Sequence, residues 1–341
     1  MSNGNSKVTV LMPVYNGERY LREAIESILN QTFTDFEFLI INDGSTDSSV
    51  EIIESYNDPR IRLVHNEKNL KLIATLNKGI DLAQGEYIAR MDCDDISLPE
   101  RLEEQVEFMD ANLAYALCGS WVEVIDENNV PTGLIWKYEG DHNKILAALL
   151  SANQFAHSTV ILRKSILTQG FYYDANYAHA EDYELWLRIA DSFKVSNIQK
   201  PLVKYRVHST SITGSKYVLM DACVRNLICA QIRKLNFEPS AAELDLHCNL
   251  ERQSLPTKGF VKQADAWLQK LRLANARNQR YPEPAFSQRL GELWFTVCDS
   301  ARGLGLWTWR KFLASPLSHL SGIGWKQKIK FGVICLLRRS R

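Results

Sequence analysis

The sequence predicts an α/β fold with a mostly parallel sheet flanked by helices, followed by a C-terminal helical region. Over about the first 210 residues, short β-branched apolar runs alternate with segments whose apolar residues recur at helical spacing. Such alternation is typical of a parallel sheet covered by helices on both faces. After about residue 215 only helical patterns remain. Because 341 residues exceed one ordinary compact core, we expect two units, 1–214 and 215–341.

The individual elements follow from local patterns. Proline cannot continue a ladder of hydrogen bonds, so Pro13 is expected to end the first strand at residue 12. Residues 97–100 resemble a capping box with proline in the first helical turn. The predicted strands lie at 8–12, 36–41, 61–64, 87–91, 115–124, 159–162 and 202–207. Helices are predicted within 20–29, 50–56, 72–83, 99–109 and 181–189.

Composition limits the class of protein. The 40 basic and 40 acidic residues balance, so the whole molecule offers no electrostatic footprint for nucleic acid. Seven cysteines without metal-binding spacing favour a reducing, cytoplasmic compartment. The N-terminus is polar, and the apolar run at 331–337 is far shorter than the ~20 residues of a spanning helix, so no membrane span is expected.

The last 41 residues, 301–341, are basic and rich in aromatic residues. They contain no acidic residue, and their basic residues are Arg302, Arg310, Lys311, Lys326, Lys328, Lys330, Arg338, Arg339 and Arg341. Among these stand Trp307, Trp309, Phe312, Trp325 and Phe331. This pattern predicts peripheral attachment to the anionic inner face of a membrane. The alternative is a helical subdomain whose aromatic side chains pack on the first unit or on a second subunit.

Acidic residues follow two of the predicted strands. In a parallel α/β sheet, ligands bind at the carboxyl ends of the strands. The sequence NDGSTD at 42–47 follows the second strand, although a turn and a helix N-cap would also account for it. The fourth strand is followed by Asp92, Asp94 and Asp95, whose charges would repel one another in a simple turn. Because Mg²⁺ and Mn²⁺ prefer oxygen ligands, this cluster predicts a metal site, with helix capping as the alternative.

Several motifs together resemble family 2 of the glycosyltransferases. They are PVYNG at 13–17, NDGSTD at 42–47, NKGI at 77–80, GEYIA at 85–89, MDCDD at 91–95, EDYELWLR at 181–188 and YRVH at 205–208. The resemblance extends from residue 8 to about residue 213. It implies a GT-A fold and an inverting transfer from a nucleotide-activated sugar, usually a UDP-sugar, assisted by Mn²⁺ or Mg²⁺.

The resemblance also implies roles for individual residues. Donor-binding residues would be Pro13, Tyr15, Glu18, Asp43, Lys71, Asp92 and Arg206, and metal ligands would be Asp94, Asp95 and His208. Asp182, beside Glu181, would be the general base that deprotonates the acceptor hydroxyl. Two positions depart from the family pattern. Lys71 stands where many relatives have glycine, which could mean a different loop, and Ser158 replaces proline after His157, a residue expected to be structural or near the acceptor.

These observations predict transfer of a hexose or N-acetylhexosamine from a UDP-sugar to a glycan or lipid-linked glycan in surface polysaccharide synthesis. Two alternatives are a sugar nucleotidyltransferase and an inactive, sugar-binding or scaffolding relative. The first would need a Gly-rich, basic loop after the first strand, which residues 13–18 do not provide. The second has no physical need for unpaired acids at both Asp94 and Asp182.

Overall fold

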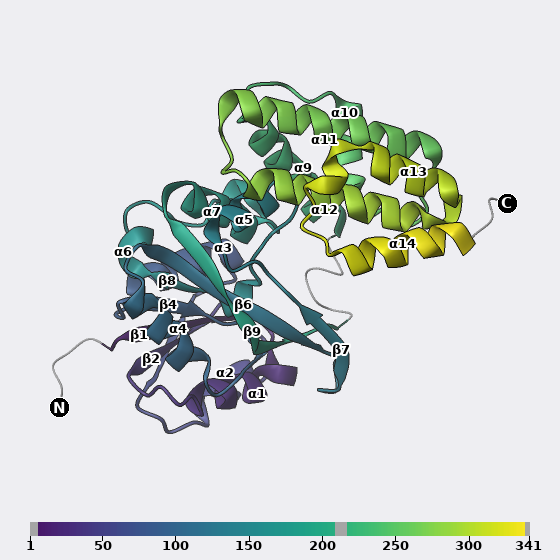
Figure 1. The fold of residues 1–341 in the computed structure, drawn as a ribbon. Helices are drawn as coiled ribbons and strands as arrows, with labels where there is room; N and C mark the ends of the chain where they lie inside the picture. The colour runs from purple at the N-terminus through teal and green to yellow at the C-terminus, as the bar shows by residue number, and fades with distance from the viewer. Residues whose placement is uncertain (1–5, 209–216, 338–341) are drawn as a thin grey trace. The chain divides into compact units, whose positions relative to one another are not determined.

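The computed structural model of the protein describes residues 6–208 and 217–337 (Figure 1). The chain forms two compact units. The first comprises Met1–His142 and Asn153–Cys223, and the second comprises Asn143–Ala152 and Val224–Arg341. The boundary predicted between residues 214 and 215 lies outside the described residues.

The first unit is built on a nine-stranded sheet in the order β3-β2-β1-β4-β8-β6-β9-β5, with β7 paired to β6. The four strands at one end, from β3 to β4, are parallel as predicted, and beyond them the sheet is mixed. The strands are β1 (Val8–Val14), β2 (Phe36–Asn42), β3 (Ile61–His65), β4 (Tyr87–Arg90), β5 (Ile96–Ser97), β6 (Tyr115–Ile125), β7 (Pro131–Trp136), β8 (Ile161–Arg163) and β9 (Lys194–Arg206).

Helices flank this sheet, as the sequence predicts. Helix α1 shows why: its apolar residues recur every three to four positions, and Leu21, Ala24, Ile25 and Ile28 are fully buried against β1 and β2. Burying each large aliphatic side chain contributes about 1.5–3 kcal/mol. The helices of the first unit are α1 (Glu18–Leu29), α2 (Ser49–Glu54), α3 (Leu72–Leu82), α4 (Arg101–Ala111), α6 (Lys164–Leu167) and α7 (Glu181–Ser192), whereas α5 (His142–Ala148) belongs to the second unit from Asn143 onward.

The prediction that the first strand ends before Pro13 is wrong, since β1 continues to Val14 and Pro13 pairs with Ile41 of β2. The carbonyl oxygen of Leu11 bonds toward the β4 side, where it accepts from Met91 N at 3.0 Å. Because Pro13 lies two residues further on, its missing N–H faces that same side, where β4 has already ended at Arg90. No ladder bond is lost, and the strand carries the chain to the sheet's carboxyl edge.

The last strand is longer than predicted, because its first half is polar. It begins at Lys194, not at residue 202. Ser196 and Asn197 are buried there and donate to backbone carbonyls: Ser196 Oγ to Gly140 O at 2.7 Å, and Asn197 Nδ2 to Glu139 O at 2.9 Å. Buried polar side chains with such partners fit a strand, although their sequence gives no alternating apolar signal.

The second unit is helical throughout its described part, which confirms the predicted C-terminal helical region. Besides α5, it contains α9 (Tyr217–Arg233), α10 (Ala241–Asn249), α11 (Lys258–Asn278), α12 (Ala285–Ser300), α13 (Leu306–Ala314) and α14 (Trp325–Leu337). Its core includes Trp267, Phe286 and Trp294. No helix among the described residues is long and apolar enough to cross a bilayer.

Most aromatic residues of the basic C-terminal segment belong to this core. Phe312 and Phe331 are 0% and 2% exposed, and their ring centroids lie 5.5 Å apart. Trp309 stacks on Phe312, and Trp307 packs at the edge of the same cluster. Placing Phe312 and Phe331 at a membrane surface is therefore wrong, because both are buried in the core of the second unit. Trp307 and Trp309 are only partly buried against that core. This packing is within the helical unit itself, which the stated alternative did not describe. Trp325, by contrast, is 68% exposed.

Gly85 holds the entry to β4 against the start of β1. A Cβ atom there would lie 2.4 Å from Thr9 N and 2.6 Å from Val8 C, both backbone atoms. The same turn is fixed by hydrogen bonds, since Thr9 Oγ1 accepts from Gly85 N at 2.8 Å and Glu37 Oε1 accepts from Gln84 N at 2.6 Å. The absence of a side chain is thus a packing requirement.

We expect Gly85→Ala to reduce the free energy of unfolding by about 1–3 kcal/mol, because two backbone segments would have to separate. Urea denaturation followed by near-UV circular dichroism measures the shift. Gly259→Ala is the control: in α11 the nearest atom to an added Cβ is Thr257 Oγ1 at 3.6 Å, so alanine is expected to be neutral or mildly stabilising. An unchanged midpoint for Gly85→Ala would contradict the proposed close packing.

Candidate active site

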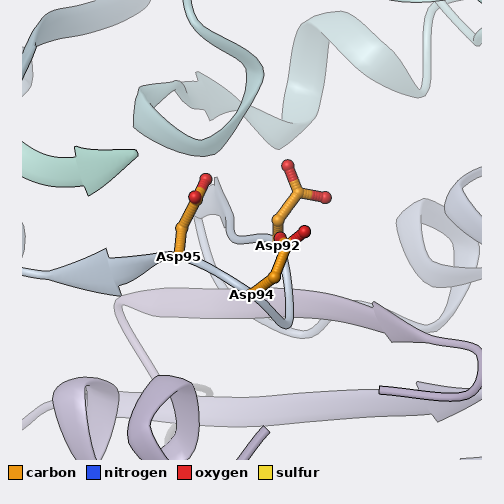
Figure 2. A group of neighbouring side chains, drawn as sticks. All are labelled: Asp92, Asp94 and Asp95. Carbon is orange, nitrogen blue, oxygen red and sulfur yellow. The ribbon is translucent and has the colours of Figure 1, made fainter. Parts of the chain in front are cut away.

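Three carboxylates meet in the turn between β4 and β5. One oxygen from each of Asp92, Asp94 and Asp95 lies within 4.8 Å of the others. Figure 2 shows the three side chains rising from this turn with their carboxylates directed to the same side. The short strand β4 ends at Arg90, so the turn begins at the carboxyl edge of the sheet, where the sequence predicts it.

The cluster is electrostatically unfavourable without a cation. Asp95 is 1% exposed, and burial, followed by the charges of Asp94 and Asp92, raises the pKa of its carboxyl well above the usual range. Like charges in a low-dielectric environment cannot all stay ionised unless a positive charge balances them. The oxygen donors and their excess negative charge fit a hard divalent cation.

Arg90 supplies one balancing charge, and the sequence analysis did not identify it. Its side chain is 3% exposed, and Nη1 contacts Asp92 Oδ2 and lies 3.2 Å from Ser158 Oγ. Burial raises the pKa values of Glu181 and Asp182, and the Arg90 charge opposes that rise. The acidic turn and the first turn of α7 are therefore both within electrostatic range of one buried guanidinium. One feature of the sequence could have pointed to Arg90: it is a charged residue directly before MDCDD, at the end of an otherwise apolar strand.

Ser158 gives a structural reason for the departure from the family pattern at this position. Its hydroxyl donates to Asp92 Oδ2 at 2.7 Å and also contacts Asp95 Oδ2. The side chain is fully buried between these two carboxylates. Proline could donate no hydrogen bond here, so serine adds a support for the acidic turn.

The end of β9 is hydrogen-bonded to the same acidic turn. Asp95 Oδ1 accepts from Arg206 N at 2.8 Å, and Arg206 Nε donates to Asp94 O at 2.7 Å. The Arg206 guanidinium pairs with Glu23 at 2.8 Å and is 1% exposed. The sequence analysis placed Arg206 among the donor-binding residues, whereas its contacts make it a buried support of the turn.

His208, two residues after Arg206, also contacts the acidic turn. Its Nε2 lies 3.0 Å from Asp94 Oδ2, and its ring centroid lies 5.2 Å from that of Tyr20. Asp94 is the more exposed partner, with 32% of its side chain accessible. The structure thus brings together two of the predicted metal ligands, one carboxylate and one imidazole, at hydrogen-bond distance.

Three of the predicted donor-binding residues, Tyr15, Glu18 and Asp43, lie just beyond the ends of β1 and β2. The segments that follow these two strands are joined: Asn16 N donates to Ser45 Oγ at 3.0 Å, and Ser48 N donates to Glu18 Oε2 at 3.0 Å. Pro13 is buried inside β1, whereas Tyr15 is 50% exposed just beyond it. Tyr15 therefore presents an aromatic ring at the carboxyl edge of the sheet.

Asp43 shapes the loop that precedes α3. Its carboxylate is buried and accepts from Asn66 Nδ2 and Leu70 N, each at 2.8 Å, and from Lys71 N at 3.0 Å. Lys71 itself has φ 74° and ψ 160°, a conformation that normally requires glycine. The loop therefore keeps the geometry that glycine would give, and the lysine side chain is exposed.

Asp182 lies in the first turn of α7. Its Oδ2 accepts from Asn153 Nδ2 at 2.9 Å. Burial, followed by the adjacent Glu181 charge, raises the pKa of Asp182 to about 7. Burial likewise raises the pKa of Glu181. A carboxyl group with this pKa is ionised in a large fraction of molecules at neutral pH and is basic enough to accept a proton.

His157 is part of an aromatic cluster with Tyr173 and with Trp186 of α7. Its Nε2 lies 2.8 Å from Tyr173 Oη, and its ring packs on fully buried Trp186. Burial lowers the pKa of His157 well below its usual value, so the imidazole is neutral. Of the two roles expected for this residue, these contacts favour the structural one.

Comparisons with known proteins find glycosyltransferases that are similar to this chain. The family description "Glycosyl transferase family 2" matches residues 9–171. The putative glycosyltransferase EpsE of Bacillus subtilis is 36% identical over 61% of this chain and 75% of its own length. The O-antigen biosynthesis glycosyltransferase WbnJ of Escherichia coli is 35% identical, over 61% of this chain and 82% of its own.

Two further proteins extend the comparison. The UDP-Glc:alpha-D-GlcNAc-diphosphoundecaprenol beta-1,3-glucosyltransferase WfgD of Escherichia coli is 30% identical over 62% of this chain and 81% of its own. Residues 1–349 of TarS from S. aureus, solved with UDP-GlcNAc, share 23% identity at a TM-score of 0.55, covering 87% of this chain and 90% of that one. This likeness supports the GT-A-type fold expected from the sequence. EpsE, WbnJ and WfgD are at least 30% identical to this chain and are matched over more than two thirds of their own length. Together with the matching family description, they show that the chain belongs to family 2 of the glycosyltransferases.

Proposed function

We propose that this glycosyltransferase is an inverting, metal-dependent enzyme. It moves a hexose or N-acetylhexosamine from a UDP-sugar to a hydroxyl of a glycan or lipid-linked glycan in surface polysaccharide synthesis, at the inner face of an anionic membrane. One observation carries the proposal: the acidic turn and a carboxyl group of pKa about 7 are both within electrostatic range of the same buried arginine. A transfer of this kind needs both a site for the leaving diphosphate and a base for the acceptor.

The metal would be Mn²⁺ or Mg²⁺, held by Asp94 and His208, with Asp95 as a further ligand. When bound, such an ion offsets the negative charge that develops on the leaving diphosphate. Both oxygens of Asp95 already have partners, since Oδ1 accepts from Arg206 N and Oδ2 contacts the Ser158 hydroxyl. Asp95 therefore retains less capacity for coordination than Asp94, and its main task is to fix the turn.

Asp182 would act on the acceptor. Its carboxylate removes the proton of the acceptor hydroxyl while the hydroxyl oxygen forms a bond to the anomeric carbon. At the same time the bond from that carbon to the UDP oxygen breaks, and the electron pair leaves with the diphosphate. One base and one displacement invert the anomeric configuration. The Asn153 amide orients the carboxylate, and Glu181 keeps its pKa high.

The donor and acceptor classes rest on relatives and on exposed residues. The names of WfgD and WbnJ support a UDP-sugar donor and a role in polysaccharide synthesis, with a lipid-linked diphosphate acceptor in the former. Tyr15 is exposed for contact with a nucleobase, and Glu18 and Lys71 are exposed on neighbouring loops. Pro13, Asp43 and Arg206 would act by holding these loops, and Asp92 by facing the donor from the acidic turn.

Metal dependence can be tested by donor binding. We expect UDP to bind at least tenfold more weakly in EDTA than in Mn²⁺, and Asp94→Asn to remove most of this difference, because the substitution deletes a charged ligand. Isothermal titration calorimetry measures both. Asp191→Asn, an exposed acid at the end of α7, is the matched control and should behave as wild type. UDP affinity that does not change on chelation would rule out the metal.

The general base can be tested by turnover. Asp182→Asn should lower kcat about 10²–10⁴-fold and leave UDP affinity nearly unchanged, because the amide keeps the size of the side chain but cannot take a proton. Asp191→Asn on the same helix again serves as control. A variant that keeps a tenth of wild-type turnover would exclude this role, and a product of retained anomeric configuration by NMR would exclude single displacement.

The pH dependence tests the same carboxyl group independently. Because Asp182 must be ionised, kcat/KM should fall as the pH decreases through about 7, approaching tenfold per pH unit. The Asn153 hydrogen bond favours the ionised form, so Asn153→Ala should raise the pKa and shift the profile to higher pH. Mn²⁺ binding measured over the same range separates this effect from titration of metal ligands. A shift to lower pH would contradict the assignment.

A further inference from the structure

Helix α14 has an apolar face that no other described residue covers. Its large exposed side chains are Trp325, Ile329, Val333, Leu336 and Leu337, with exposed fractions from 46% to 78%. The first four recur at intervals of four, four and three residues, so they lie on one face of the helix. We call these five residues the α14 apolar stripe.

The opposite face of α14 fixes the helix in this orientation. Phe331 and Cys335 are buried in the core of the second unit. Gly332 lies against Trp309, whose ring would be 3.0 Å from an added Cβ atom. Lys328 Nζ donates to Ser318 O at 2.8 Å. Because packing on this side determines the rotation of the helix, the outward position of the α14 apolar stripe is part of the folded structure.

Positive charge borders the α14 apolar stripe. Lys326 and Lys330 are exposed on the same helix. At 100° per residue, both project beside the stripe, near Val333 and Leu337. Helix α13 adds the exposed side chains of Leu306, Arg310 and Leu313. The whole segment 301–341 has no acidic residue, and its last three arginines, Arg338, Arg339 and Arg341, lie outside the described residues.

We propose that the α14 apolar stripe and its flanking lysines dock this protein on an anionic lipid bilayer. The 13 residues of α14 lie in the membrane plane with apolar side chains among the acyl chains near the headgroups, and the lysine ammonium groups reach lipid phosphates. The docking residues differ in part from the sequence expectation: Trp325 is retained, and four aliphatic side chains take the place of the buried Phe312 and Phe331.

Charge favours a membrane over a second copy of the chain. A symmetric dimer through the α14 apolar stripe would place Lys326 and Lys330 of both copies along the same contact, with no acid in either segment to pair them. An anionic bilayer supplies the complementary charge and accepts the apolar side chains at once. The inference deepens the proposed function, because a lipid-linked acceptor would lie in the same membrane.

The test uses the full chain and vesicles of phosphatidylcholine alone or with about a third phosphatidylglycerol. We expect co-sedimentation with the anionic vesicles only at 0.1 M salt, and release at 1 M, where the Debye length falls to ~3 Å. Ile329→Ser with Val333→Ser should abolish binding. Lys326→Ala with Lys330→Ala should weaken the partition coefficient about 25-fold, roughly fivefold for each lysine.

Two controls make the test specific. Leu255→Ser removes a side chain that is 84% exposed elsewhere in the second unit, and Lys262→Ala removes an exposed lysine of α11, so neither should change vesicle binding. Circular dichroism confirms that each variant is folded. Equal binding to both kinds of vesicle, no binding to either, or wild-type binding by the stripe variant would overturn the proposal. So would dimerisation of the wild type that the stripe variant abolishes.

The same variants separate this inference from the proposed function. Without vesicles, the stripe variant should hydrolyse a UDP-sugar in Mn²⁺ at the wild-type rate, because no residue of α14 belongs to the acidic turn or to α7. Asp182→Asn, conversely, should bind anionic vesicles normally. Failure of vesicle binding with intact hydrolysis overturns the docking surface alone, and the reverse result overturns the proposed reaction alone.

Discussion

The site depends on one buried positive charge. Arg90 contacts Asp92, supports Ser158 and biases the ionisation of Asp182 and Glu181. A second buried arginine fixes its backbone, since Arg101 Nη2 donates to Arg90 O at 2.8 Å. Burial, with the Arg90 charge, lowers the pKa of Arg101 to about 9. Isolated charges in a protein interior are very costly, so arginines and carboxylates here can exist only as a set.

That set determines what the acidic turn can do. Arg90 neutralises Asp92, and Ser158 and the Arg206 backbone occupy the oxygens of Asp95. Asp94 is about as exposed as Asp92, at 32% against 31%, but it has His208 beside it instead of a buried arginine. The cluster is therefore not three equivalent acids. Two of them hold the turn, and the third, with an imidazole, faces the place where a cation and a diphosphate would meet.

Local signals in the sequence predicted the parallel strands and the acidic turn, because apolar periodicity and motif spacing are properties of neighbouring residues. The role of Asp182 came from the family resemblance and stays a prediction. The supports of the site were missed, because they join distant positions: Ser158 is 66 residues from Asp92, and Arg206 is 111 from Asp95. Lys71 shows the same limit, since a glycine-like φ is imposed through Asp43, 28 residues away. In the C-terminal segment, composition could count aromatics but could not assign them to a face.

The two units are not simply consecutive in the sequence, because a short segment of the second unit interrupts the first. Residues Asn143–Ala152 leave the first unit, and Ala147 and Leu150 among them are buried in the core of the second. His247 Nε2 lies 3.1 Å from Leu150 O and holds that short segment from the same unit. The chain re-enters the first unit at Asn153, the residue that donates to Asp182. Asn153 thus stands three residues along the chain beyond Leu150, whose side chain is packed in the core of the second unit.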